Sequence, residues 1–354
     1  MTPQTKVALL VPLSGPSATM GNSMVDAATM ALYDYYLTLP SEHIHSQVIL
    51  MPKDCGDTPA AAAAAAKQAI EEGATFIVGP LFSQSVSAVA PIAAEKNISM
   101  LSFSNNRAVA NHSVFVFGFL PEQQIIRVAD YAFLHNYQRV ALLAPNDAYG
   151  EKIQETLVNA YTQKGGSVAP AELYAPSPAN IDAAVGRLAA YNNANQERRF
   201  QAIFIADGGY QLKNIIASLK KTNIDLKKIK LLGTGLWDDP AIANIPEMEG
   251  AWFSSSPPEP YQRFEKRFMT TYNYKPARLA SLAYDAVTIV AEVSTPGNGG
   301  VNTATLTDPT GFDSPANGMV RLLTGGNSDR KLAIMEVSPA GFKVIDTALT
   351  NFNQ

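Results

Sequence analysis

The sequence predicts an α/β protein with two Rossmann-like lobes, each built around a parallel sheet. Short runs of β-branched and apolar residues alternate with longer alanine-rich segments along most of the chain, which is the pattern of βα units. At 354 residues, the chain is also too long for one ordinary hydrophobic core. We therefore expect two lobes of moderate size with separate cores.

The first part of the chain alternates strands and helices in a regular order. Its short apolar runs predict strands at Lys6–Pro12, Gln47–Pro52, "ATFIVGP", "ISMLSFS" and "VFVFGFL". Helices are expected at Asn22–Leu37, Thr58–Glu72 and Ser85–Lys96. The alanine tract Ala60–Ala66 favours a close-packed helix, because alanine has the highest helix propensity.

The middle of the chain repeats this design. Strands are expected at "RVALLAP", "GSVAPAELY", "QAIFIADG", "KIKLLGTG" and "GAWFSSSPP". Helices are expected at Gln123–Asn136, Tyr149–Lys164, Ile181–Asn192 and Tyr210–Lys220. No linker rich in proline or glycine separates this series from the first, so composition alone does not mark a boundary between the lobes.

The last part of the chain changes character. Two helices are expected after Trp252, at "YQRFEKRFMTTYNY" and "RLASLAYDAVTIVAEV", and then strands in hairpins at "MVRLLTGG", "RKLAIMEVSPAG" and "FKVIDTAL". Because helices resume there, we expect the chain to return to the first lobe before it ends. The predicted N-terminal lobe is 1–120 plus 251–330, and the predicted C-terminal lobe is 121–250 plus 331–354. A multi-strand hinge is expected to join them, with a ligand cleft between them.

Composition excludes several classes of function. The net charge of −4, from 27 basic and 31 acidic residues, gives no electrostatic basis for binding nucleic acid or an anionic membrane. The single cysteine, Cys55, excludes an intrachain disulfide and a multi-cysteine metal site. No apolar run reaches the ~18 residues that span a bilayer. The run "VALLVPL" is interpreted as the first strand, and Met1 as an added start on a mature fragment whose signal peptide has been removed.

The sequence offers no set of residues for catalysis. It contains no G-x-S-x-G, H-E-x-x-H or C-x-x-C motif. The stretch "GTGLWD" has Asp238 where a dinucleotide fingerprint requires its third glycine, and "GPSATMG" lacks the lysine of a P-loop. His43 and His45 could share a strand face, but without carboxylate or cysteine partners a solvated loop is expected. We therefore predict a protein that is not an enzyme and has no metal or cofactor.

Small polar residues follow six of the predicted parallel strands. They are Ser14 and the stretches Gly79–Ser85, Ser102–Arg107, Asn146–Gly150, Ala206–Tyr210 and Gly235–Asp239. The carboxyl ends of parallel strands meet at one sheet edge, beside helix N-termini that favour anions. A single serine could merely cap a helix, but the repetition predicts a ligand site. Tyr149, Tyr210 and Trp237 would form its flat walls, although each alone would more often belong to a core.

Several of these segments resemble a known family. The stretches "KVALLVPLSGPSATMGNSMVDAATMAL", "RVALLAPNDAYGEKI" and "AIFIADGGY" resemble type I periplasmic solute-binding proteins, with the leucine/isoleucine/valine-binding branch most similar. The resemblance covers nearly the whole chain. It implies a periplasmic receptor whose two lobes close on a small polar ligand, such as a branched-chain amino acid. It also implies delivery of that ligand to the permease of an ABC-type transporter.

The resemblance also implies roles for single residues. Ser83 stands at the carboxylate-binding serine, with Ser104 and Asn106 at the contacts beyond it, while Tyr149 and Tyr210 stand at contacts of the second lobe. Ser14 is expected in the lip of the first lobe, and Trp237 at a wall of the second. The acidic residue usual after the "LLGTG" strand is missing, with only Asp238 as a possible substitute. The ligand's identity therefore stays open.

A second resemblance implies a different function. The stretches "FLPEQQIIRVADYAF", "MEGAWFSSSPPE" and "PARLASLAYDAV" are similar to the receptor-like domain of penicillin-binding-protein activators, which are outer-membrane lipoproteins. This resemblance implies a lipid anchor in the full-length protein and a surface for a penicillin-binding protein, through which peptidoglycan synthesis is regulated. A transport receptor and an activator scaffold are thus the two functions that the sequence suggests.

Overall fold

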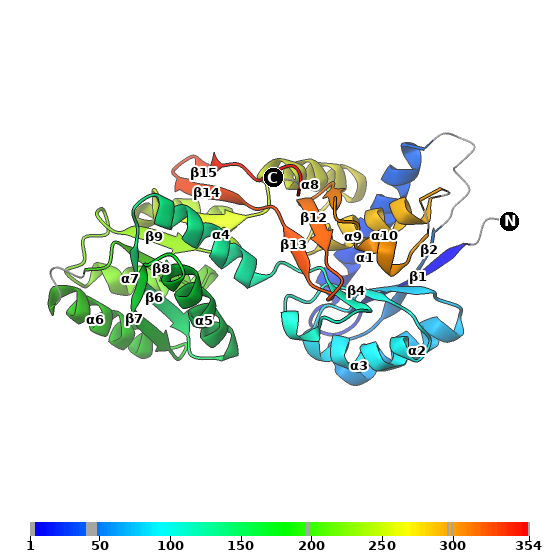
Figure 1. Ribbon diagram of the computed structural model, residues 1–354, viewed down its shortest axis with the longest axis horizontal. Helices are drawn as coiled ribbons and strands as arrows, with labels where there is room; N and C mark the ends of the chain where they lie inside the picture. The colour runs from blue at the N-terminus through cyan, green and yellow to red at the C-terminus, as the bar shows by residue number, and fades with distance from the viewer. Residues whose placement is uncertain (1–3, 40–47, 195–198, 296, 299, 353–354) are drawn as a thin grey trace. The chain divides into compact units, whose positions relative to one another are not determined.

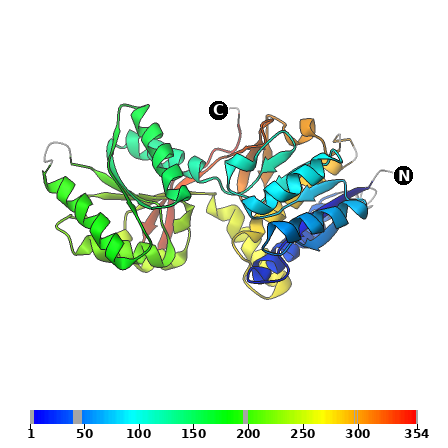
Figure 2. The same cartoon turned by 90° about the horizontal axis from the view of Figure 1, so that it is seen from below.

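The computed structural model describes residues 4–39, 48–194, 199–295, 297–298 and 300–352. The chain forms two compact units, each assembled from separate segments. Unit 1 consists of Met1–Leu120, Pro257–Lys331 and Leu349–Gln354, and unit 2 of Pro121–Ser256 and Leu332–Ala348. In each unit helices cover both faces of a sheet (Figures 1 and 2).

Unit 1 is built on a five-stranded parallel sheet with the order β2-β1-β3-β4-β5. Its strands are β1 (Thr5–Val11), β2 (Val48–Asp54), β3 (Phe76–Val78), β4 (Met100–Ser102) and β5 (Val114–Val116). Helices α1 (Ala18–Leu37) and α9 (Ala280–Ser294) pack on one face, and α2 (Pro59–Glu71) and α3 (Ser83–Ala94) on the other.

Strand β1 is apolar over its buried part, from Val7 to Val11, because helices cover both faces of its sheet. Val7, Leu9 and Val11 belong to the core beneath α1 and α9, whereas Ala8 and Leu10 belong to the core beneath α2 and α3. Successive side chains of a strand point to opposite faces, so a strand covered on both faces must be apolar at every position. The small residue Ala8 lies on the side of the alanine-rich helix α2, where it leaves room for close packing.

Unit 1 contains further elements outside this sheet and its four covering helices. They are the short helix η2 (Arg107–Val109), the helices α8 (Pro258–Tyr272) and α10 (Thr303–Leu306), and a three-stranded antiparallel sheet of β11 (Phe312–Ser314), β12 (Gly318–Leu322) and β13 (Ser328–Arg330). The fully buried Asp285 of α9 accepts hydrogen bonds from the Ala316 backbone (2.8 Å) and the Asn317 side chain (2.7 Å). These bonds fix α9 to the β11–β12 turn.

Unit 2 is built on a seven-stranded sheet with the order β15-β14-β10-β9-β8-β6-β7. The strands β6 (Arg139–Pro145), β7 (Ser167–Tyr174), β8 (Ala202–Ile205), β9 (Lys230–Gly233) and β10 (Trp252–Ser255) are parallel, whereas β14 (Ala333–Ser338) and β15 (Gly341–Asp346) pair antiparallel.

Four helices cover the sheet of unit 2. One face carries α4 (Pro121–Leu134) and α5 (Ala148–Thr162), and the other carries α6 (Pro178–Ala194) and α7 (Gly209–Lys220). The short helices η4 (Gly235–Trp237), η5 (Pro240–Asn244) and η6 (Pro246–Met248) lie between β9 and β10. The predicted α/β class with two lobes around parallel sheets is confirmed.

Two expected assignments to the lobes differ from the structure. Residues 251–256 were expected in the first lobe, but β10 is a strand of unit 2, where it pairs with β9 and β14 and buries Phe253. The tail 349–354 was expected in the second lobe but belongs to unit 1, where the Phe352 ring lies 4.4 Å from the guanidinium carbon of Arg321. Both departures come from tertiary contacts that local sequence patterns do not encode. Met1, His43 and His45 lie outside the described residues.

Candidate functional site

The strand-end loops of unit 1 lie along one edge of its sheet because β1 to β5 run in parallel. Two glycines bring these loops close to the strands. A Cβ atom at Gly21 would lie 1.7 Å from the Pro12 carbonyl oxygen, and one at Gly79, where φ is +97°, would lie 2.2 Å from the Leu10 carbonyl oxygen. Only glycine fits at both positions, so the start of α1 can lie close to the end of β1, and the loop that carries Ser83 can pass close to β1.

Ser14 lies in an exposed loop that a neighbouring carboxylate holds. Asp54, at the end of β2, accepts hydrogen bonds from the backbone of Leu13 (2.8 Å) and Gly56 (2.9 Å). A further hydrogen bond from the Ser14 side chain is the largest cause that keeps the pKa of Asp54 below its usual value. Ser14 therefore forms part of an ordered loop, in which its hydroxyl is already bonded to Asp54.

Ser83 is the first residue of α3, and its environment suits an anion. The residue before it, Phe82, forms no side-chain cap, so the first-turn N–H groups of this twelve-residue helix have no capping side chain. The Ser83 hydroxyl forms no hydrogen bond with any described residue, and Ser83 is half-buried. Uncapped N–H groups, the positive end of the helix dipole and an adjacent hydroxyl together form an anion-binding arrangement.

Ser104 and Asn106 order the loop after β4. The buried Ser104 hydroxyl accepts a hydrogen bond from the Asn106 backbone (3.1 Å), and the Ser104 backbone donates to the Ser102 hydroxyl (3.0 Å). The Asn106 side-chain oxygen accepts from the Ala108 backbone (3.0 Å), which caps η2. The hydroxyl of Ser104 thus bonds within its own loop, whereas Asn106 is exposed.

The strand ends of unit 2 carry a carboxylate that the sequence analysis did not single out. Asp207 follows β8, and its Oδ2 accepts a hydrogen bond from the Tyr174 hydroxyl (2.8 Å). Its Oδ1 accepts from the Gly208 backbone (2.9 Å), and its main-chain oxygen accepts from the Trp237 indole (2.9 Å). The signal was present in "ADGGY", where an acidic residue directly follows a buried strand.

Two tyrosine hydroxyls surround this carboxylate. Burial, followed by the nearby Asp207, raises the pKa of Tyr174, so its hydroxyl stays protonated as a donor. Burial likewise raises the pKa of Tyr149 to about 12, although a hydrogen bond with Thr234 opposes the shift. Tyr149, Tyr174 and Asp207 thus form a polar cluster with negative charge at the strand ends of unit 2.

The structure separates the two other predicted aromatic residues of unit 2. Tyr210, in the first turn of α7, is 72% exposed and available to a ligand. Trp237 was predicted to form a wall of the ligand site, but it is fully buried. Its indole donates a hydrogen bond to the main-chain oxygen of Asp207 and so holds the Asp207 loop. The prediction that Trp237 forms a wall of the site is corrected. Asp238, the possible acidic substitute, accepts a hydrogen bond from the Ser255 hydroxyl (2.9 Å).

Comparison with known proteins identifies the family. A family model described as periplasmic binding protein matches residues 4–341, which is most of the chain. The chain belongs to the periplasmic binding protein family. It is similar in fold to a branched-chain amino acid ABC transporter periplasmic ligand-binding protein from Burkholderia xenovorans, with a TM-score of 0.80 at 18% identity, covering 98% of this chain and 96% of that one.

Two protein sequences are similar to part of this chain. An uncharacterized protein of Rickettsia prowazekii is 30% identical over 247 residues, which cover 68% of this chain and 63% of that protein. The penicillin-binding protein activator LpoA of Yersinia pseudotuberculosis is 26% identical over 192 residues, which cover 46% of this chain and 29% of that protein. The matched part is thus less than two thirds of either relative's own length.

No helix among the residues that the structure describes is both long and apolar enough to cross a membrane. Within the same residues, no group of three or more histidine, cysteine, aspartate or glutamate side chains is arranged to hold a metal ion.

Proposed function

We propose that this chain is the solute-binding component of an ABC-type transporter. Its ligand in this proposal is a small molecule that carries both a carboxylate and an ammonium group, as a branched-chain amino acid does. The observation that carries the proposal is the uncapped N-terminus of α3 with the unbonded Ser83 hydroxyl beside it. The name of the Burkholderia relative, a branched-chain amino acid ligand-binding protein, supports the same ligand class.

Unit 1 carries donor groups at its strand ends that suit a carboxylate. The first-turn N–H groups of α3 and the Ser83 hydroxyl are all donors, and a charge-assisted hydrogen bond of this kind contributes about 1.5–3 kcal/mol. Ser14, in the loop beside them, and Asn106, at the next strand end, border the same sheet edge. Ser104 acts indirectly, because its hydroxyl orients the Asn106 backbone.

Unit 2 carries a negative group at its strand ends that suits an ammonium. Asp207 takes the role that the sequence pattern would give to an acid after "LLGTG", and the Tyr174 hydroxyl holds its carboxylate in place. Tyr149 and the exposed Tyr210 lie in the first turns of α5 and α7, which follow the neighbouring strands β6 and β8, and Tyr210 can cover the ligand's apolar side chain.

A calorimetric titration tests the proposal. Leucine, isoleucine and valine are each titrated into the full chain and into Ser83→Ala, and thermal shift provides a second readout. We expect at least one of the three to bind, and Ser83→Ala to lower its affinity at least about tenfold. Ser87→Ala is the matched control, because it removes a hydroxyl one turn further along the exposed side of α3. No binding by any of the three, or equal losses in both variants, would contradict the proposal.

The LpoA match favours a second candidate function, activation of a penicillin-binding protein. In that case the chain binds a cell-wall synthase through its surface, and amino acids have no effect on it. Stimulation of a purified penicillin-binding protein's transpeptidase activity, unchanged in Ser83→Ala and Asp207→Asn, would favour this candidate over transport.

A further inference from the structure

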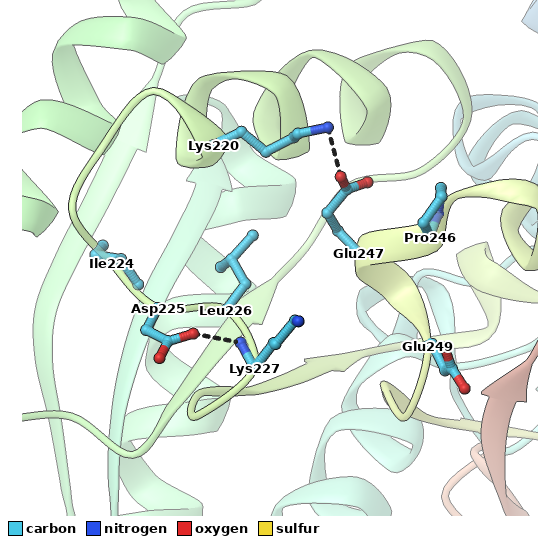
Figure 3. A pocket seen from close by; sticks show the side chains of 8 residues that line it. All are labelled: Lys220, Ile224, Asp225, Leu226, Lys227, Pro246, Glu247 and Glu249. Carbon is cyan, nitrogen blue, oxygen red and sulfur yellow. Dashed lines mark hydrogen bonds and ion pairs between the residues drawn. The ribbon is translucent and has the colours of Figure 1, made fainter.

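Unit 2 contains a depression at the opposite sheet edge from Asp207. It has a volume of about 630 Å³ and lies between the end of α7, the loop before β9 and the helix η6 (Figure 3). Its lining includes Lys220, Ile224, Leu226, Lys227, Glu247 and Glu249. Because β9 and β10 begin at this edge and end at the edge of Asp207 and Tyr149, the depression is separate from the candidate site.

The depression combines an apolar floor with charged walls. Ile224 and Leu226 supply the apolar surface, and the Lys220–Glu247 ion pair, at 2.5 Å, forms one wall. Figure 3 shows the side chains of Leu226 and Lys227 projecting from the loop toward this ion pair. Cavities of roughly 300–1,000 Å³ with an apolar surface and a few polar groups are typical of small-molecule sites.

Two opposite charges on this lining remain unpaired. Most of the surrounding charges have partners: Lys220 pairs with Glu247, and Lys228 lies 3.6 Å from Asp225. By contrast, neither the Lys227 ammonium nor the Glu249 carboxylate forms an ion pair with any residue of the described ranges. The lining therefore presents one free positive and one free negative group.

A smaller inner cavity continues the depression toward the core. It has a volume of about 150 Å³, shares Leu226, Lys227, Glu247 and Glu249 with the outer one, and reaches Tyr137 and Lys230. The half-buried Lys230 ammonium donates to the Gly250 carbonyl (2.7 Å) and lies 4.1 Å from the centre of the Trp252 ring. Since an ammonium has three N–H donors, Lys230 retains donor capacity beyond its bond to Gly250.

We propose that this depression is a second small-molecule site, which binds a short zwitterionic peptide. The peptide's carboxylate enters the inner cavity between Lys227 and Lys230, its ammonium pairs with Glu249, and its apolar side chains cover Leu226 and Ile224. This assignment uses every unpaired charge that the lining presents. A ligand with a single charge would leave either Lys227 or Glu249 without a partner, and an uncharged ligand would leave both.

Desolvation explains why the inner cavity favours a carboxylate. Burial lowers the pKa of Lys230, although the nearby Glu336 opposes this shift. The cation is thus incompletely compensated in its present surroundings, and a carboxylate would restore part of the lost solvation. The half-buried position also gives a bound group less competition from water than the rim does.

The experiment uses methyl NMR of the full chain with labelled isoleucine and leucine methyl groups. The signals of Ile224 and Leu226 report on this depression, and they are assigned from Ile224→Val and Leu226→Met. The probe is the dipeptide leucyl-leucine. Its concentration is raised in about tenfold steps from the protein concentration up to 10 mM. Two matched probes are N-acetyl-leucyl-leucine, which lacks the ammonium, and leucyl-leucine amide, which lacks the carboxylate.

The supporting result has three parts. Leucyl-leucine shifts both signals in a saturable manner, each blocked probe binds at least tenfold more weakly, and Lys227→Met and Glu249→Gln each weaken binding at least tenfold. Lys221→Met is the matched control, since this lysine pairs with Asp182 and lies outside the lining, and it leaves binding unchanged. Ser83→Ala also leaves it unchanged, which separates this proposal from the proposed transport function.

Two results would overturn the proposal. One is the absence of shifts at Ile224 and Leu226 up to 10 mM dipeptide. The other is binding that persists at equal strength in Lys227→Met and Glu249→Gln, or with both blocked probes, because the unpaired charges would then have no part in it.

Discussion

The strand ends of the two units differ in the sign of the groups that they present. In unit 1 the groups available at α3 are donors, namely N–H groups and the Ser83 hydroxyl. The nearby Asp54 carboxylate already accepts hydrogen bonds from the backbone of Leu13 and Gly56. In unit 2 the central group is the Asp207 carboxylate, which the Tyr174 hydroxyl holds. Two units of similar design therefore have opposite electrostatic preferences at their strand ends: the groups of unit 1 suit an anion, and those of unit 2 suit a cation.

The largest effect is expected from a change of backbone geometry at a strand end of unit 1, compared with the same change at a strand end of unit 2. Gly79→Ala places a Cβ against the Leu10 carbonyl at a positive φ, whereas Gly209→Ala, at φ +51°, meets nothing within 4 Å. We expect Gly79→Ala to lower the free energy of unfolding by about 3 kcal/mol or more, and Gly209→Ala by about 1 kcal/mol. Urea unfolding measures both, and equal losses would show that the close approach at Gly79 is unimportant.

A change of charge in unit 2 is expected to have the next largest effect. Asp207→Asn keeps the size of the side chain but removes the negative charge, so affinity for an amino acid should fall by about ten- to a hundredfold. Calorimetry measures the change. Asp182→Asn, which removes an exposed carboxylate of α6 in the same unit, should leave affinity unchanged. If both variants bind equally well, the ammonium is held elsewhere.

The smallest expected effect is a pH dependence in unit 2. Because the folded-state pKa of Tyr149 is raised from 10.0 to about 12, its contribution to stability is complete below pH 10 and is lost as the pH rises toward 12. We expect the unfolding free energy of Tyr149→Phe to fall less steeply over this range than that of the unchanged chain. Urea titrations at pH 9, 10 and 11 measure the slope, and identical slopes would contradict the assignment.

Local patterns predicted most of the fold but only part of the candidate site. The buried part of β1 is apolar because helices pack on both faces of its sheet, and the alanine tract of α2 reflects close packing on one of those faces. Both features can therefore be predicted from the sequence. The burial of Trp237 depends on how η4 folds back against β8, which no periodicity reveals. Asp207 was overlooked because one acid after a strand resembles an ordinary loop residue until the Tyr174 hydroxyl is placed beside it.

The depression near Lys227 shows a second limit of sequence reasoning. Its lining comes from the end of α7, the loop before β9 and the segment around η6, which are brought together only by the order of the strands. Each stretch alone looks like a solvated loop with lysines and glutamates. Whether a charge is paired or free depends on distances between these stretches, and so it becomes visible only in the folded unit.

The division of unit 1 into separate segments also has a consequence for synthesis on the ribosome. Strand β1 is made at the start, but α9, which covers one of its faces, is made only after the main segment of unit 2. Strands β14 and β15 of unit 2 follow still later. The core beneath α1 and α9 therefore cannot be completed until most of unit 2 has been translated. The core beneath α2 and α3 has no such delay, because all of its residues lie between Ala8 and Val114.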